Sequence, residues 1–114
     1  MLIDLEEAKT YLRVDSSNDT TLVLNLIPAA EKKVVDVARL SADECQNICE
    51  ANGNSVRIRG EEYSPSEIVM IYHLLRGAVL YALGYMYEHR EEGDYHELEL
   101  TLRSYLSSIR EGVI

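Results

Sequence analysis

The chain has 114 residues, enough for one domain with a single modest core, and its composition of 46% apolar and 27% charged residues is that of an ordinary globular protein. Its formal charge is −9, from 11 Lys and Arg against 20 Asp and Glu. Proteins that bind nucleic acids or anionic membranes concentrate positive charge. Here the nearest approach to a basic patch is Arg57 and Arg59, followed at once by Glu61 and Glu62. The charge therefore argues against sequence-specific DNA binding and against membrane attachment.

Helix starts are the clearest local signal. Four times a short polar residue is followed three positions later by Glu, at Asp4 and Glu7, Ser41 and Glu44, Ser64 and Glu67, and Asp94 and Glu97. At this spacing the first side chain accepts a hydrogen bond from a free N–H of the first turn, and the Glu reaches back to the N-cap amide. Each pair precedes an apolar periodic stretch, so the pattern predicts four helix N-termini.

The first half of the chain predicts two helices joined by a polar turn over residues 15–19. The first helix covers Leu5–Leu12 and the second Thr20–Arg39. The second has an apolar stripe at Leu22, Leu26, Ala30, Val34 and Val37. Pro28 lies inside it and removes one backbone hydrogen bond, which predicts a kink. The alternative is an extended segment over Thr21–Ile27, with the helix beginning at Pro28.

The middle of the chain predicts a third helix and a small hairpin. The helix covers Ala42–Ala51 and is closed by Asn52-Gly53, which tolerate left-handed backbone geometry. Apolar and charged residues then alternate over Ser55–Arg59, and a second short strand around Glu62-Tyr63 can pair with this one. Because an isolated hairpin is marginal in water, it needs support from its own domain or from a neighbouring subunit.

The second half predicts one long helix, Pro65–Arg90, and a last helix, Tyr95–Glu111. The long helix buries a wide stripe of Ile68, Ile71, Tyr72, Leu75, Val79, Ala82 and Met86. The last helix turns Leu98, Leu102, Tyr105, Leu106 and Ile109 inward. Gly77 and Gly84, seven residues apart on another face of the long helix, suggest that a further helix approaches closely there. The fold class is mainly α, with about five helices around a long central helix and a small β-hairpin between helices three and four, all in one domain over residues 1–114.

The long helix also bears on membranes and on assembly. The segment 68–87 is about as long as a bilayer span, but it contains His73 and Arg76, and an Arg at mid-bilayer costs about 2.5–3.5 kcal/mol. A core helix is the better interpretation.

Because the long helix is apolar on more than one face, part of its surface is left for partner subunits. The eight Tyr, with neither Phe nor Trp, suit such half-buried contacts, although drift in aromatic usage explains them equally well.

Motifs that carry chemistry do not occur in the sequence. It has no G-x-S-x-G, no Gly-rich phosphate loop and no H-E-x-x-H. Cys45 and Cys49 share a helix face and are interpreted as small buried apolar residues. The acidic segment 88–96 contains His89 and His96 and could be imagined as a metal site, but a solvated helix end is the simpler interpretation. We expect no enzymatic activity, no cofactor and no metal.

Two stretches resemble a known family. In the first, a short helix ends in Tyr11-Leu12-Arg13-Val14-Asp15, and after a turn rich in Asp and Asn an amphipathic helix ends in Ala29-Ala30-Glu31-Lys32-Lys33. In the second, Tyr87-Glu88-His89-Arg90 closes a long apolar helix, and the last helix ends in Leu106-Ser107-Ser108-Ile109-Arg110. This layout resembles the phage head-tail connector family of gene-product-6-like neck adaptors. The chain departs from the family's minimal pattern in its longer middle section and in Pro28.

The resemblance implies a ring-forming structural protein of the virion neck, assembled in the cytoplasm of a bacterial host. Its expected partners are further copies of itself in a twelve-fold ring that matches the portal, the portal protein, and the head-closure or stopper protein. DNA would pass through the lumen without specific binding, and no membrane takes part. Arg13, Asp15, Tyr87, Glu88 and Arg90 are carried over as structural or subunit-contact residues.

The charge and the two glycines add to this expectation. An acidic lumen would repel DNA phosphates and favour sliding, so some carboxylates are expected to face the channel. The helix face with Gly77 and Gly84 is expected at or near the subunit interface. The alternative is a small acidic helical regulatory protein, antitoxin-like or anti-repressor-like, that binds one cellular partner.

Overall fold

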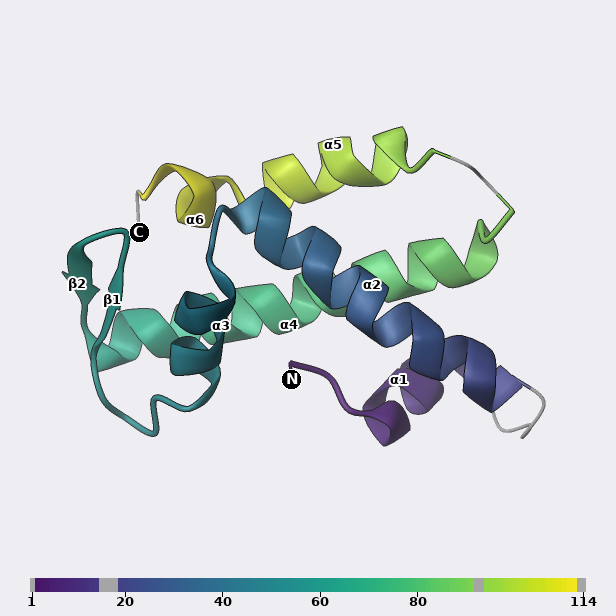
Figure 1. The fold of residues 1–114 in the computed structure, drawn as a ribbon, viewed down its shortest axis with the longest axis horizontal. Helices are drawn as coiled ribbons and strands as arrows, with labels where there is room; N and C mark the ends of the chain where they lie inside the picture. The colour runs from purple at the N-terminus through teal and green to yellow at the C-terminus, as the bar shows by residue number, and fades with distance from the viewer. Residues whose placement is uncertain (1, 15–18, 92–93, 113–114) are drawn as a thin grey trace.

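The computed structural model describes residues 2–14, 19–91 and 94–112 (Figure 1). In these residues the chain forms six helices and one two-stranded sheet: α1 (Leu5–Leu12), α2 (Thr20–Ala38), α3 (Ala42–Cys49), β1 (Val56–Ile58), β2 (Glu61–Tyr63), α4 (Pro65–Glu88), α5 (His96–Tyr105) and α6 (Ser107–Glu111). The predicted fold class is confirmed: the protein is mainly helical, and a small hairpin lies between α3 and α4.

The long helix α4 organises the fold. It packs most extensively against α2, which crosses it diagonally, and it also contacts α1, α3 and α5 (Figure 1). Its length and composition alone would allow it to cross a membrane. Within this fold it buries a continuous set of side chains: Ile68, Ile71, Leu75, Ala78, Val79, Ala82, Leu83 and Met86. Of the predicted stripe only Tyr72 is partly exposed, so the central position expected for this helix is confirmed.

Three of the four predicted helix starts carry a complete capping box. Asp4, Ser41 and Ser64 each accept from the backbone N–H three residues on, and the Glu at that position binds back to the cap. The fourth prediction is wrong. Tyr95 occupies the N-cap of α5 without a side-chain cap bond. The helix begins one residue later than Asp94 would require, and the Tyr95 ring packs edge-on against Tyr85 at 6.1 Å.

Two further predictions need correction. The single last helix is broken at Leu106, where two serines that compete with backbone hydrogen bonding follow, and α6 continues as a separate short helix. Tyr105, expected to point inward, is 47% exposed. In α2 the buried stripe begins with Val23 and Ile27, while the predicted Leu22 and Leu26 are only partly buried. Both pairs have helical spacing, and packing against α4 selects the first.

The second helix continues through its proline. α2 is helical from Thr20 to Ala38 with Pro28 inside it, so the alternative of an extended segment over Thr21–Ile27 is wrong. Pro28 itself is exposed. Solvent can therefore reach the carbonyl that loses its helical partner, which makes the proline tolerable at this position.

The hairpin is supported from within its own chain. Arg59 and Gly60 form a two-residue loop, and both have positive φ, as a type I′ turn requires. Val56, Ile58 and Tyr63 are buried in the core. The backbone N–H of Arg59 donates to Glu44 of α3 at 2.7 Å. A neighbouring subunit is therefore not needed to hold the hairpin in place.

The N-terminal segment is held between α2 and α4. Leu2 and Ile3 are almost fully buried. The Leu2 N–H donates to Glu31 of α2 at 2.6 Å, and the Leu2 carbonyl accepts from Arg76 of α4 at 2.9 Å. Arg76 also forms an ion pair with Glu7 of α1. The arginine that argued against a membrane span therefore fixes α1 against the central helix.

Candidate subunit interface

The end of α4 is fastened by the residues of its closing motif. The Tyr87 hydroxyl donates to Asp19, at the start of α2, over 2.7 Å. This hydrogen bond raises the pKa of Tyr87 above its usual value. Arg90 donates to the Tyr87 carbonyl at 2.6 Å, and its guanidinium lies 5.1 Å from the centre of the Tyr87 ring. Tyr87 and Arg90 thus have a structural role that links α4 to α2.

The other two residues of the motif face different surroundings. His89 Nδ1 lies 2.9 Å from the Tyr85 carbonyl, and the His89 ring stacks on the Tyr85 ring with centroids 4.1 Å apart. Glu88 is exposed and has no ion-pair partner among residues 2–14, 19–91 and 94–112. Its carboxylate is therefore available to another chain.

A groove of about 610 Å³ lies between α1 and the C-terminal half of α4. We call it the tyrosine groove, and it is lined by Tyr11, Leu12, Arg13, Tyr81, Gly84, Tyr85, Tyr87, Glu88 and His89. It brings together four residues that the sequence singles out in separate segments, Arg13, Gly84, Tyr87 and Glu88. Arg90 lies beside it, in a neighbouring hollow with Glu88. Asp15 lies outside the described residues.

The two glycines of α4 make room for tyrosine side chains of the same chain. A Cβ added at Gly84 would lie 3.2 Å from Cε2 of Tyr11, which comes from α1. A Cβ added at Gly77 would lie 2.5 Å from the hydroxyl oxygen of Tyr105, which comes from α5. The sequence suggests that another helix approaches closely at this face, and α1 and α5 both contact α4, each with a tyrosine ring against one of the glycines. Gly77 is not among the groove residues.

Large apolar side chains remain exposed around this groove and along α4. Tyr11 is 48% exposed and Tyr81 is 45% exposed, so both present ring surface to solvent. Nearer the N-terminus of α4, Val69 and Met70 are about half exposed, at 51% and 54%. Tyr and Met are enriched where protein surfaces meet, and a tyrosine ring contributes apolar area while its hydroxyl stays hydrated. The arrangement is suited to contact with another protein chain.

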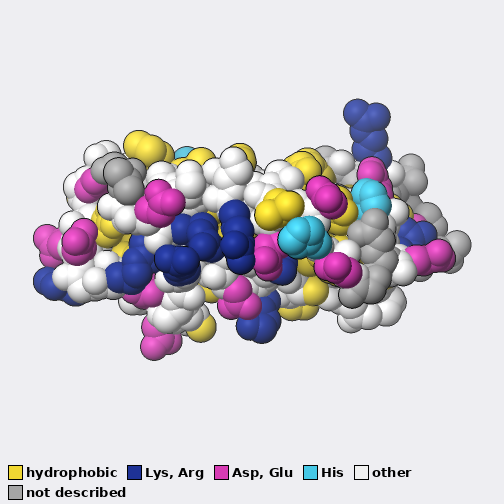
Figure 2. Space-filling view, turned by 90° about the horizontal axis from the view of Figure 1, so that it is seen from above, with side chains coloured by type: hydrophobic (Ala, Val, Ile, Leu, Met, Phe, Trp, Pro, Cys, Tyr) yellow, Lys and Arg dark blue, Asp and Glu magenta, His cyan; other side chains and the backbone are white. Residues whose placement is uncertain are grey.

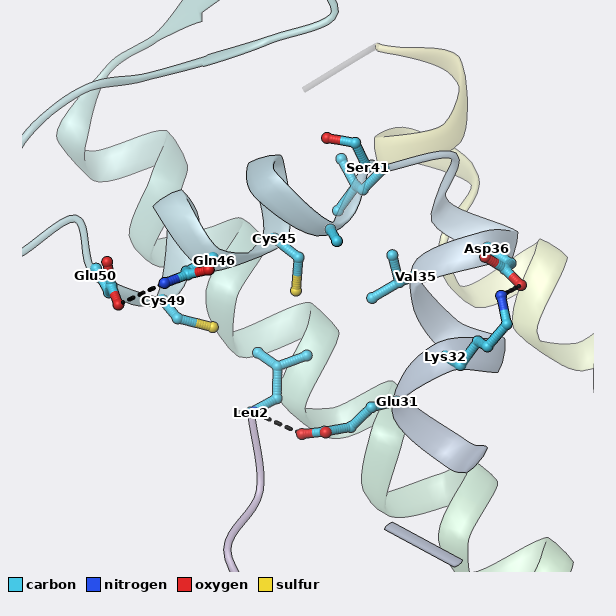
Figure 3. A pocket seen from close by; sticks show the side chains of 12 residues that line it. Leu2, Glu31, Lys32, Val35, Asp36, Ser41, Cys45, Gln46, Cys49 and Glu50 are labelled. Atoms are coloured by element: carbon cyan, nitrogen blue, oxygen red, sulfur yellow. Dashed lines mark hydrogen bonds and ion pairs between the residues drawn. The ribbon is translucent and has the colours of Figure 1, made fainter. Parts of the chain in front are cut away.

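A second hollow, of about 880 Å³, lies between α2 and α3 (Figure 3). The Cys45 and Cys49 sulfurs point into it, and both thiols are free. Burial, reinforced by the neighbouring Cys49 and by the charge of Glu31, raises the pKa of Cys45 to about 11. Such a thiol is protonated at neutral pH and is a poor nucleophile. In the described part of the chain, no group of three or more His, Cys, Asp or Glu could hold a metal ion.

These features define a class of protein. The described residues present a groove lined by half-exposed tyrosines and further exposed apolar side chains along the long helix α4. These are the features of a small helical protein whose exposed surface on a long helix is suited to contact with another chain.

The family follows from comparison with known proteins. A family model described as phage gp6-like head-tail connector protein matches residues 2–113, and the chain belongs to this family. Searches of curated proteins and of solved structures gave no significant match. The family is structural, so the protein is a head-tail connector and a component of the virion neck. The match covers nearly the whole chain and decides against the regulatory protein considered as the alternative.

Proposed function

We propose that this connector assembles into a closed ring below the portal, lengthens the DNA channel, and presents its other side to the head-closure or stopper protein. The observation that carries the proposal is the tyrosine groove. Residues from both motifs that resemble the family line this groove. Tyr11 and Tyr81 at its rim are each about half exposed. A ring of twelve subunits would match the portal, and assembly would take place in the cytoplasm of a bacterial host.

A closed ring needs a heterologous interface, in which one patch meets a different patch on the next subunit. The chain offers two separate apolar patches on α4. Met70 and Gly84 are 14 positions apart on the helix, roughly 21 Å at ~1.5 Å per residue. We propose that the exposed Val69 and Met70 of one subunit enter or border the tyrosine groove of the next. Arg13, Glu88 and Gly84 are then subunit contacts, and Gly77 lies near the interface.

The net charge of −9 supports a passive channel. DNA must slide through a neck ring, and carboxylates on the lumen wall would repel its phosphates. We propose that part of the excess of Asp and Glu lines the channel and that DNA is not bound specifically. No membrane is involved in this assembly.

The test is negative-stain electron microscopy of the purified protein, concentrated alone and then mixed with the portal protein encoded by the same phage. Rings with an open lumen, or an additional layer on the portal, are the expected result. Tyr81→Asp places a charge at the groove rim and should abolish the rings, whereas Thr101→Asp, at an exposed position of α5, should leave them intact. Wild-type protein that neither forms rings nor binds the portal would refute the proposal.

A further inference from the structure

Positively charged residues from three distant segments meet at the C-terminal end of α2. Arg59, in the hairpin loop, donates to the carbonyl of Arg39 at 2.9 Å and also to the carbonyl of Ile109 in α6. Arg110 of α6 donates to the carbonyl of Val37 at 2.7 Å. The guanidinium groups of Arg59 and Arg110 are thereby held where α2, α6 and the hairpin meet, and the exposed Arg39 is the residue that closes α2 there.

Two more cations extend this cluster along α2 and α5. Lys33 and Arg103 bind the two oxygens of Glu99, at 2.7 Å and 3.1 Å. We call the set Lys33, Arg39, Arg59, Arg103 and Arg110 the basic band, and it holds five of the 11 Lys and Arg of the chain. Figure 2 shows a group of dark-blue side chains near the middle of one face of the molecule, with magenta side chains on either side of it.

Carboxylates compensate this band only in part. Glu99 forms ion pairs with two of the five cations, Lys33 and Arg103. No ion pair within 4.0 Å is formed by Arg39, Arg59 or Arg110 in the described ranges 2–14, 19–91 and 94–112. Arg59 and Arg110 instead face carbonyls at helix ends, which carry only about half a negative charge per helix. A positive surface therefore remains on a chain whose total charge is −9.

We propose that the basic band binds an acidic surface of a neighbouring copy of this chain, an inference that rests on the proposed ring. Removing the five positive charges of the band from the total of −9 leaves −14 for the rest of the chain, so every neighbour is rich in carboxylates. The acidic surface assigned to the contact is the end where α4 closes and α5 begins, with Glu88, Glu91, Asp94 and Glu97. All four of these residues are exposed.

The band suits a protein surface better than the DNA in the channel. Phosphate recognition by Arg uses a free planar fork of donors, and the forks of Arg59 and Arg110 are already directed at carbonyls. What remains available is long-range attraction and the side chain of Arg39, which forms no ion pair or side-chain hydrogen bond with the other described residues. Long-range attraction between complementary surfaces fixes the register of subunits. In this arrangement the band is turned into the subunit interface and away from the lumen.

The test compares Arg39→Glu with Lys9→Glu, which lies on α1 outside the band and makes the same change in charge. Assembly is followed by sedimentation velocity and electron microscopy, alone and on portal rings, at low and high salt. We expect Arg39→Glu to raise the concentration for half-assembly about tenfold at low salt, and Lys9→Glu to change it less than about twofold. Thermal melting should be alike for both, because the Arg39 side chain is exposed and forms no ion pair with the other described residues.

The reciprocal variant identifies the partner surface. Glu91→Lys should weaken assembly on its own, and the double variant Arg39→Glu/Glu91→Lys should recover at least part of the loss. An additive loss in the double variant would overturn the assignment of the acidic surface.

Rings of Arg39→Glu that form like those of Lys9→Glu would refute this inference while leaving the ring itself established. Wild-type protein without rings or portal binding would refute the ring first, and tight binding of a short DNA duplex that Arg39→Glu abolishes would make the band a DNA surface.

Discussion

Substitution of Gly84 separates the stability of the subunit from its assembly. The added Cβ of Gly84→Ala would lie 3.2 Å from the ring of Tyr11, so this ring must shift by a few tenths of an ångström. Tyr11 is 48% exposed and is free to do so. Replacing a helix-interior glycine by alanine gains about 1 kcal/mol, which offsets the displaced contact. We expect the free energy of unfolding to stay within about 1 kcal/mol of wild type, a melting shift of at most ~4–8 °C.

The leucine variant uses the same position to close the groove. Gly84→Leu places a large side chain where Tyr11 and Tyr81 border the tyrosine groove. If a neighbouring subunit occupies this groove, assembly should weaken by tenfold or more, while the melting temperature falls only modestly. Thr101→Leu on the exposed surface of α5 is the matched control. Calorimetry and sedimentation velocity give the two quantities. Rings of Gly84→Leu that form at wild-type concentrations, with the protein folded, would refute the role of the groove.

The remaining predictions concern the contacts that hold the subunit together. Arg59→Met removes the donor shared by α2 and α6 and should lower the free energy of unfolding in urea by about 1–2 kcal/mol, whereas Arg57→Met on the exposed side of β1 should cost less than about 0.5 kcal/mol. Tyr87→Phe removes the hydroxyl that joins α4 to α2 and should cost about 1 kcal/mol in the same assay. Hydrogen bonding to Arg76 lowers the pKa of Glu7 below its usual 4.5. The carboxyl of Glu7 therefore binds its proton less tightly in the folded state than in the unfolded chain. The free energy of unfolding should fall as the pH drops below about 4.5, and it should fall less in Glu7→Gln.

Local patterns in the sequence were enough to predict most of the fold. The capping boxes at Asp4, Ser41 and Ser64 fix three helix starts because their hydrogen bonds are made within four residues. The missed features depend on distant groups. The rotation of α2 that buries Val23 is set by packing against α4, and the exposure of Tyr105 follows from the break between α5 and α6. Neither is encoded in local spacing.

The candidate sites differ in the same way. The tyrosine groove could be anticipated in part, because both motifs that form it already resembled the family. Gly84 could be singled out because a glycine inside a helix is destabilising. The basic band could not be anticipated. Its members lie between positions 33 and 110, and Arg59 is followed in the sequence by Glu61 and Glu62. Only the folding of the hairpin and α6 onto the end of α2 brings these cations together.

The positions of the two proposed contact surfaces agree with head-to-tail assembly. Tyr87, in the tyrosine groove, is bound to Asp19 just before α2 begins, and the basic band gathers where α2 ends at Ala38. The 19 residues of α2 span roughly 28 Å at ~1.5 Å per residue. Surfaces this far apart on one rigid helix can face different neighbours. Glu88 and Glu91, which the band would meet, lie at the groove end, so the band end of one subunit and the groove end of the next carry opposite charges.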